Sequence, residues 1–377
     1  MIKNFAALAI AGLTFFNSLA QTTAKEWYDK GIALKKSKSY KEAINAFKKA
    51  AALQTSYADA LYQLGWCYNE EKMYNEAIDV LKKEEKAGSV DKARNNFEIG
   101  FALNGIKKYD DAILKFNMAI DLDASYALAY KERGNSYYWN KVYKNAIPDY
   151  TKYAELETTI TDELFYYRKG WCENDQEEYN KGAESLKKCV ALDKEYTDAY
   201  SELGYAYYKL NLNDDALYNY QIAMSLDKTD YHPVIGTADI YYDNLKNYDS
   251  AIVYYKEGLL LTRTNKKAYY KLGWCYNDKN NFTEAVDPLK QAVLLDAEYD
   301  AARTELGYAY YKLDKYDDAL AQFRPIMAHD AKDELSRYYA GFCYYLKNDQ
   351  EGLKKMIDEL KELNSTKYME TLTKYIK

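Results

Sequence analysis

One seven-residue motif occurs three times in this chain of 377 residues. It reads LGWCYNE at residues 64–70, KGWCEND at 169–175 and LGWCYND at 272–278. Each copy places a thiol, an amide and a carboxylate beside an indole ring, so the motif could be a chemical site that is used three times. Thiols and carboxylates act as nucleophiles, acid–base groups or metal ligands, whereas Trp is typical of recognition surfaces.

The cysteine and histidine positions support neither nucleophilic catalysis nor a metal centre. No CxxC pair occurs, and His232 and His329 stand alone, so the spacing of a zinc site is missing. No nucleophile–base pair and no Gly-rich phosphate loop stands out. The sequence therefore predicts a protein that is not an enzyme and that uses no cofactor and no metal.

Charge and hydropathy narrow the range of partners. The 52 Lys and Arg residues interleave with 58 Asp and Glu residues, and the formal net charge is −6. Because there is no basic stripe of the kind that neutralises phosphates, nucleic acid is not an expected partner. No segment after the first twenty residues is apolar enough to span a membrane.

The first twenty residues have the features of a secretory signal peptide. Lys3 precedes an apolar run, Phe5–Phe16, and the small residues Ser18 and Ala20 occupy the two positions that a signal peptidase reads. We expect cleavage after Ala20 and an exported, periplasmic protein. The alternative is that this segment forms a hydrophobic first helix of the fold.

Glycine recurs with a regular period, which indicates a repeat architecture. The spacings are 34 to 36 residues, with one double gap, at positions 31, 65, 100, 134, 170, 204, 273, 307 and 341. Leu61, Leu64, Gly65 and Tyr68 fall on one helical stripe, and a second stripe follows in each period, so each period predicts two helices. The motif recurs every third period, which indicates that a three-repeat unit was duplicated.

The pattern resembles the tetratricopeptide repeat family: Gly100, Leu103, Ala112, Phe116 and Ala119 have the spacing of that family. The resemblance implies an all-α, right-handed superhelical solenoid of about ten helix–turn–helix repeats over residues 21–367, with a capping helix at 368–377. The expected repeats are residues 24–57, 58–91, 93–126, 127–160, 163–196, 197–230, 232–265, 266–299, 300–333 and 334–367. The seventh repeat lacks its glycine, and we expect it to be the softest joint.

Each first helix has two apolar faces. Four cysteines share the position two after the glycine and are expected in the core: Cys67, Cys172, Cys275 and Cys343. The positions three before, one after and four after the glycine form the other face, which in the resembled family lines a concave groove for peptides or partner helices. The residues expected to bind a partner there are Tyr62, Trp66, Asn69, Phe97, Phe101, Asn104, Tyr167, Trp171, Asn174, Tyr205, Tyr208, Tyr270, Trp274, Asn277, Tyr308 and Tyr311.

These features predict a non-enzymatic scaffold of the bacterial cell envelope that binds a protein or peptide in its concave aromatic groove. A glycan is the alternative ligand, because Trp and Tyr platforms with Asn and acidic residues also suit sugars. A third interpretation is that the rings only pack against neighbouring helices. The same residues serve all three interpretations, so the sequence does not separate them.

Overall fold

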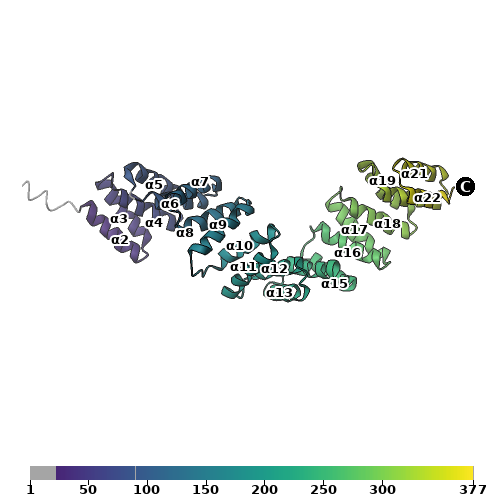
Figure 1. Ribbon diagram of the computed structural model, residues 1–377, viewed down its shortest axis with the longest axis horizontal. Helices are drawn as coiled ribbons and strands as arrows, with labels where there is room; N and C mark the ends of the chain where they lie inside the picture. The colour runs from purple at the N-terminus through teal and green to yellow at the C-terminus, as the bar shows by residue number, and fades with distance from the viewer. Residues whose placement is uncertain (1–22, 90, 377) are drawn as a thin grey trace, which may run out of the picture. The chain divides into compact units, whose positions relative to one another are not determined.

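The computed structural model describes residues 23–89 and 91–376. Over that part of the chain the regular elements are twenty-one α-helices and one π-helix, without any β-strand (Figure 1). Successive helices form antiparallel pairs, and within each of the two compact units of the chain neighbouring pairs pack on one another. The protein is therefore an all-α helical repeat solenoid, as the sequence predicts. The expected signal peptide lies outside the described residues.

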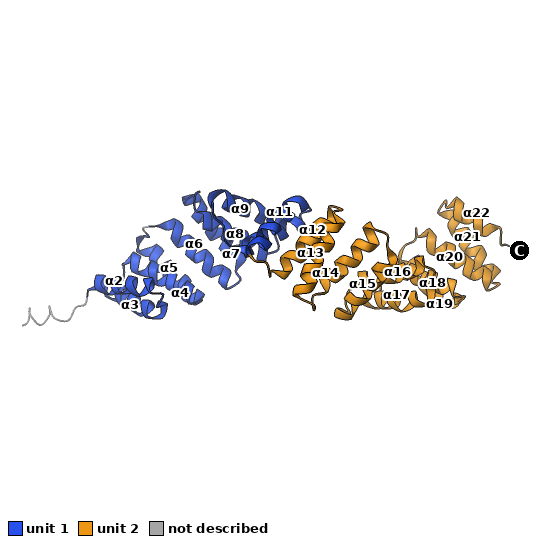
Figure 2. Cartoon of the chain, turned by 90° about the horizontal axis from the view of Figure 1, so that it is seen from below, with its two compact units in different colours: residues 1–192 blue, residues 193–377 orange. Residues whose placement is uncertain are grey.

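The chain divides into two compact units, residues 1–192 and 193–377 (Figure 2). The described part of unit 1 holds five helix pairs. They are α2 (Ala24–Lys36) with α3 (Tyr40–Leu53), α4 (Ala58–Glu70) with α5 (Tyr74–Gly88), α6 (Lys92–Gly105) with α7 (Tyr109–Leu122), α8 (Ala127–Trp139) with α9 (Tyr143–Leu156), and α10 (Glu163–Asp175) with α11 (Tyr179–Leu192).

The described part of unit 2 holds five further pairs and a final helix. They are α12 (Thr197–Lys209) with α13 (Asn213–Leu226), α14 (Tyr231–Asp239) and the π-helix η1 (Ile240–Asn244) with α15 (Tyr248–Leu261), α16 (Lys266–Asp278) with α17 (Phe282–Leu295), α18 (Asp300–Lys312) with α19 (Tyr316–His329), α20 (Glu334–Leu346) with α21 (Gln350–Glu362), and lastly α22 (Thr366–Thr373).

The two helices of a pair meet where a glycine of the first helix faces a bulky side chain of the second. A Cβ atom on Gly65 would lie 2.5 Å from Cγ of Leu81, and one on Gly273 would lie 2.4 Å from Cγ of Leu289. Side-chain atoms do not approach so closely, so these helices come as near to one another as glycine alone permits. This close crossing explains the period of glycine in the sequence.

The turn that follows each first helix contains a residue in the left-handed conformation. After α2, Lys38 has a φ of 59°, and the amides of Lys38 and Ser39 donate to the carbonyls of Lys35 and Leu34 at 2.9 Å. This Schellman arrangement satisfies the last carbonyls of the helix. The same conformation recurs at Lys72, Lys107, Lys141, Glu177, Asn211, Lys246, Asn280, Asp314 and Asn348. Because the left-handed region costs an L-residue about 1 kcal/mol, the packed helices impose this turn.

Between the starts of its two helices, at Tyr231 and Tyr248, the seventh repeat contains one residue more than most repeats. Ala238 takes the place of the repeat glycine when positions are counted from the start of α14, whereas Asp239 takes it when they are counted back from Tyr248. Between them and α15 lies η1, and a π-helix holds more residues per turn than an α-helix. The extra residue is therefore absorbed before α15 begins, and the following helices keep the spacing of the other repeats.

The cysteines predicted in the core are buried there. Each of the four thiols is fully buried and free. Burial raises the pKa of each thiol to about 12, which suppresses the reactive thiolate at neutral pH. The thiols of the repeated motif, at Cys67, Cys172 and Cys275, and the equivalent Cys343 are thus small apolar core groups.

The last pair of helices is covered by α22. Leu372 of α22 is fully buried, and a Cβ atom on Gly341 of α20 would lie 2.4 Å from its Cδ1 atom. The helix thus begins two residues earlier than the capping helix expected at 368–377. It ends at Thr373.

Candidate functional site

All of the expected partner-binding residues lie on first helices, but they differ in how much of each side chain solvent reaches. Tyr205 is exposed, with 37% of its surface accessible. Asn69, Phe97, Asn174 and Asn277 are buried. The half-buried members are Tyr62, Trp66, Phe101, Asn104, Tyr167, Trp171, Tyr208, Tyr270, Trp274, Tyr308 and Tyr311.

The three Trp residues of the repeated motif pack against the preceding repeat. In each case the indole meets, edge to face, the aromatic ring that begins the preceding second helix. The pairs are Trp66 with Tyr40 at 5.6 Å, Trp171 with Tyr143 at 4.4 Å, and Trp274 with Tyr248 at 5.2 Å between ring centroids. Such contacts contribute about 1 kcal/mol each. Each indole therefore contacts the preceding repeat, while part of its surface stays accessible to solvent.

Two of the three Asn residues of the motif, Asn69 and Asn277, hold neighbouring first helices together. Nδ2 of Asn69 donates to the backbone carbonyl of Glu98 at 3.0 Å and to its Oε2 at 2.7 Å. Nδ2 of Asn277 makes the same two bonds to Glu305, at 3.0 and 2.8 Å. The sequence placed these amides on an accessible face, whereas the structure buries them. The helical period predicts on which face of the helix each Asn lies, but it does not predict the hydrogen bond to a carboxylate of the next repeat that accompanies its burial.

The carboxylates that accept these bonds are a feature that the sequence analysis missed. Burial raises the pKa of Glu98 to about 7, against the opposing effects of the Asn69 hydrogen bond and the Lys35 charge. Burial likewise raises the pKa of Glu305, which the Asn277 hydrogen bond lowers. Both residues stand two before a repeat glycine, and acids recur at this position. Aligning the repeats on their glycines could have revealed this column of carboxylates.

In unit 2 the first-helix face contains a pocket of about 290 Å³. Trp274 and Asn277 of α16, Glu305 and Tyr308 of α18, and Tyr339 of α20 line it. Three of these residues were expected to bind a partner, and the pocket brings them together. A pocket of this volume, lined by rings, carboxylates and an amide, suits a single side chain of a ligand rather than a large molecule.

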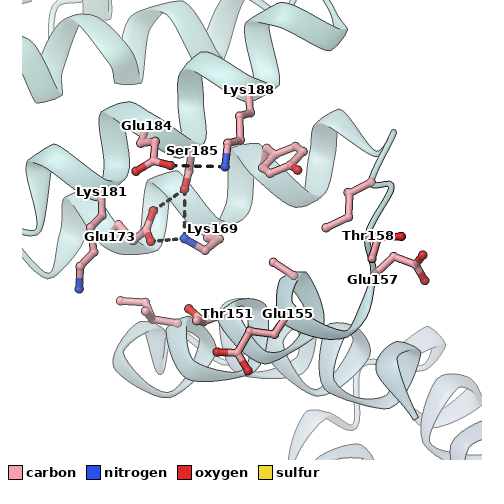
Figure 3. Close-up of a pocket in the computed structure, with 14 residues that line it drawn as sticks. Thr151, Glu155, Glu157, Thr158, Lys169, Glu173, Lys181, Glu184, Ser185 and Lys188 are labelled. Carbon is pink, nitrogen blue, oxygen red and sulfur yellow. Dashed lines mark hydrogen bonds and ion pairs between the residues drawn. The ribbon is translucent and has the colours of Figure 1, made fainter. Parts of the chain in front are cut away.

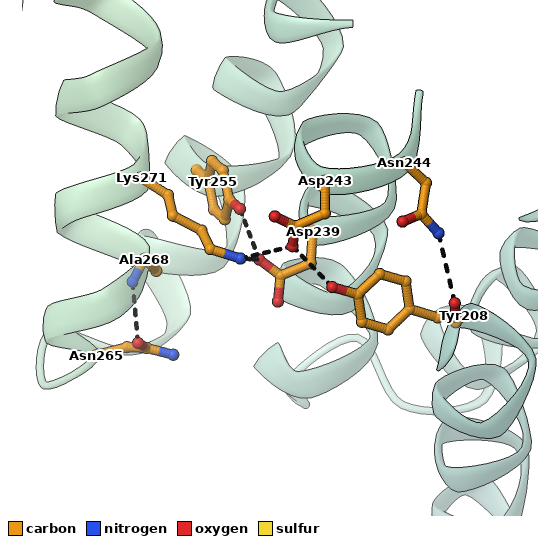
Figure 4. Close-up of polar contacts among 8 residues, drawn as sticks. All are labelled: Tyr208, Asp239, Asp243, Asn244, Tyr255, Asn265, Ala268 and Lys271. Atoms are coloured by element: carbon orange, nitrogen blue, oxygen red, sulfur yellow. Dashed lines mark hydrogen bonds and ion pairs between the residues drawn. The ribbon is translucent and has the colours of Figure 1, made fainter. Parts of the chain in front are cut away.

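A second pocket of the first-helix face, of about 210 Å³, contains the expected residues Tyr205 and Tyr208. Behind it lies a polar network of the seventh repeat (Figure 4). The Tyr208 hydroxyl donates to Asp243 at 2.7 Å, and Nζ of Lys271 donates to Asp239 and Asp243 at 2.7 and 2.8 Å. Tyr208 therefore ties α12 to the seventh repeat, and Lys271 ties that repeat to α16.

A cavity of about 650 Å³ in unit 1 lies among α9, α10 and α11 (Figure 3). Lys169 pairs with Glu173 at its edge, and Ser185 donates to Glu173 at 2.6 Å. The corresponding residues of the first copy are Leu64 and Tyr68, so an ion pair replaces an apolar pair in the middle copy. This exchange accounts for the Lys and the Glu by which the middle copy, KGWCEND, differs from the first copy, LGWCYNE. None of the residues expected to bind a partner lines this cavity.

A competing surface is present on the second helices. Leu260 of α15 is 81% exposed, and Leu294 of α17 is 76% exposed. Tyr218 of α13 is exposed as well. Exposed apolar side chains of this size also occur at binding surfaces, so any binding experiment must separate the two faces.

Neither a metal-binding cluster nor a membrane-spanning helix is present among the described residues. No group of three or more His, Cys, Asp or Glu side chains in that part of the chain is arranged to hold a metal ion. None of the helices described combines the length and the apolar character that crossing a bilayer requires.

Comparison with protein families identifies the repeats. Residues 34–83 and 165–196 match family models described as tetratricopeptide repeat. The chain is a tetratricopeptide-repeat protein. Residues 244–326 of this tetratricopeptide-repeat protein match a further model, described as anaphase-promoting complex, cyclosome, subunit 3.

The tetratricopeptide-repeat protein is similar to two curated proteins. It is 29% identical over 98 residues to the heat shock protein STI1 of Saccharomyces cerevisiae. This match covers 26% of this chain and 16% of that protein. It is 21% identical over 244 residues to the anaphase-promoting complex subunit 3 of Schizosaccharomyces pombe. This match covers 65% of this chain and 36% of that protein. The matches thus span well under half of either relative.

Solved structures also resemble it. One is the C-terminal part of a TPR repeat-containing protein from Cytophaga hutchinsonii, with 22% identity and a TM-score of 0.49 over 65% of this chain and 99% of that chain.

Proposed function

We propose that this tetratricopeptide-repeat protein is a non-enzymatic scaffold, exported to the bacterial cell envelope, that binds a partner protein or peptide on the face of its first helices. The observation that carries this proposal is the pocket that joins Trp274, Tyr308 and Tyr339 on that face. Trp and Tyr rings are typical anchors of protein interfaces. Export rests on the signal-like pattern of the first twenty residues.

A protein ligand is favoured over a glycan by the state of the Asn side chains. The glycan alternative counts on Asn amides that are free to bond to sugar hydroxyl groups. The amides of Asn69 and Asn277 are instead buried and donate to Glu98 and Glu305. What the face offers to a ligand is mainly rings and carboxylates, which suit peptide side chains.

The test is capture of partners from an envelope extract by matched variants. The first-helix variant is Tyr205→Ser/Tyr308→Ser, which removes rings from both pockets without disturbing the Trp contacts to preceding repeats. The matched control is Leu260→Ser/Leu294→Ser, which removes exposed apolar side chains from second helices. Circular dichroism and a urea titration of each variant establish that it is folded.

The proposal expects a protein that is retained by the wild type and by the second-helix control but lost from the first-helix variant. The opposite pattern would assign binding to the second helices. Export is checked separately by fractionation of cells and by sequencing of the mature N-terminus, which should begin at Gln21. A cytoplasmic protein that still begins at Met1 would refute the envelope location.

A further inference from the structure

The pocket among α16, α18 and α20 has a chemical preference. We propose that it binds a basic side chain, Arg or Lys, of a peptide; the inference rests on the proposed function because it names the kind of partner that the first-helix face takes. Two carboxylates, of Asp278 and Glu305, line the pocket, and no Lys or Arg is among its lining residues. Nζ of Lys312 lies outside it, 5.6 Å from the ring of Tyr308. A cation entering the pocket would therefore meet uncompensated negative charge.

The aromatic lining also favours a cation. Trp274, Tyr308 and Tyr339 surround the pocket, and the faces of such rings attract ammonium and guanidinium groups. The centroids of Tyr308 and Tyr339 are 5.2 Å apart, so these two rings pack on one another and form one aromatic wall of the pocket. Rings together with carboxylates select a basic group over a neutral apolar one.

The first copy of the three-repeat unit contains an internal version of this arrangement. There Nζ of Lys35 lies 3.5 Å from the centroid of Trp66. The charges of Glu98 and Glu70 both act on Lys35. Trp66 corresponds to Trp274 of the third copy, Glu98 to Glu305, and Glu70 to Asp278.

In the third copy the place of Lys35 is taken by Tyr242, whose ring meets Trp274 edge to face at 5.2 Å. The third copy therefore has the rings and the carboxylates but lacks the lysine. A basic side chain from a partner would bring a cation to the same ring and carboxylates, in the pocket that Trp274, Asp278 and Glu305 line.

One lining residue of the pocket is smaller in the third copy than in the first. Thr304 lines the pocket, and the corresponding residue in the first copy is Phe97. The ring of Phe97 is buried and packs on Phe101, Phe116 and Tyr126. Threonine is much smaller than phenylalanine, and the ring of Tyr339 packs instead on Tyr308 and Phe323, the counterparts of Phe101 and Phe116.

The floor of the pocket adds to its negative character. Asn277 is 5% exposed and lines the pocket. Its Oδ1 atom is buried, and no described residue donates a hydrogen bond to it. Burial also raises the pKa of Glu305, as expected of a carboxylate without a cation beside it. A ligand with several N–H donors fits a floor of acceptors.

The test uses two small probes and the mature chain labelled with 5-fluorotryptophan. N-acetyl-arginine methylamide carries the cation, and N-acetyl-citrulline methylamide has nearly the same shape without the charge. The chain has five Trp residues, and the fluorine signal of Trp274 is assigned with Trp274→Phe. We expect the arginine probe to shift the Trp274 signal in a saturable way and the citrulline probe to leave it in place.

Three variants locate the effect. Thr304→Phe should abolish the shift by filling the pocket, and circular dichroism establishes that this variant is folded. Asp278→Asn and Glu305→Gln should each weaken binding about threefold, the effect of losing one partly exposed charge pair. Asp249→Asn changes the net charge equally but lies outside the pocket, in a pair with Lys279, and should have no effect.

Equal shifts with both probes, or a shift that survives Thr304→Phe, would overturn the inference. So would a Trp274 shift caused by a chito-oligosaccharide but not by the arginine probe, which would make the pocket a glycan site. The capture experiment is independent of these probes. A partner lost from the first-helix variant while the arginine probe fails would retain the proposed function and refute the basic pocket alone.

Discussion

The carboxylate of Glu98 should make the folded protein less stable at neutral pH than in mild acid. It lies between α4 and α6, accepts a hydrogen bond from Asn69, and has a pKa of about 7 because burial disfavours its charged form. The perturbation that tests this is Glu98→Gln. The glutamine carbonyl can still accept the Asn69 hydrogen bond, so the substitution removes the charge and keeps the contact.

The sign and the size follow from the two pKa values. The ordinary pKa is 4.5 and the folded one is about 7, so between these values the folded chain binds more protons than the unfolded chain. The stability must then fall as the pH rises through this window. At 1.36 kcal/mol per pKa unit, the loss is about 3 kcal/mol, fully present above pH 7 and absent below pH 4.5. Glu98→Gln should recover this free energy at pH 8 and change little near pH 4.5.

Urea unfolding followed by circular dichroism at several pH values measures this difference. Because repeat arrays can unfold in stages, hydrogen exchange of the amides in α4 to α7 supplies the local value. Glu76→Gln, on the exposed face of α5, is the matched control and should show no such pH dependence. If Glu98→Gln is no more stabilising at pH 8 than at pH 4.5, or if Glu98 titrates near 4.5 by NMR, the reasoning is wrong.

Three further predictions concern the core. Gly273→Ala should destabilise unit 2 by about 1–3 kcal/mol, because its Cβ would strike Leu289; an unchanged urea midpoint would contradict the close crossing. Arg133 donates to both carboxylate oxygens of the buried Asp149, at 2.8 and 2.6 Å, so Arg133→Met should cost about 3–5 kcal/mol, and Arg133→Met/Asp149→Leu should recover most of it in the same unfolding assay. A thiol reagent should react with the four core cysteines only as urea unfolds the chain, and rapid reaction in the native state would refute their burial at Cys67, Cys172, Cys275 and Cys343.

The fold was predictable because its packing repeats. Gly65 must lie opposite Leu81, and the same close contact recurs in most periods, so a glycine and a bulky residue recur in the sequence at the same spacing. The core position of the cysteines followed from the same count. The helical period was sufficient to predict two helices in each repeat, since these depend on contacts inside one pair, whereas the solenoid arrangement was what the family resemblance implied.

The contacts between repeats were not predictable in this way. The count placed Asn69 on the groove face, but its actual partner is Glu98, which lies on the next first helix. Likewise, nothing in the period of the third copy signals that Thr304 lines a pocket where the first copy has the larger Phe97. These features depend on pairs of residues about thirty positions apart, which a single helical stripe does not specify.

The π-helix of the seventh repeat has a consequence for how such a chain can change. An insertion inside a helix normally turns every later side chain by about 100° and would expose the core face. Here the surplus residue is used up within Ile240–Asn244, and α15 starts with Tyr248 in its usual place. The damage of an insertion is thereby confined to one turn of one helix. A protein assembled from copies can in this way tolerate a local error without discarding the copies that follow it.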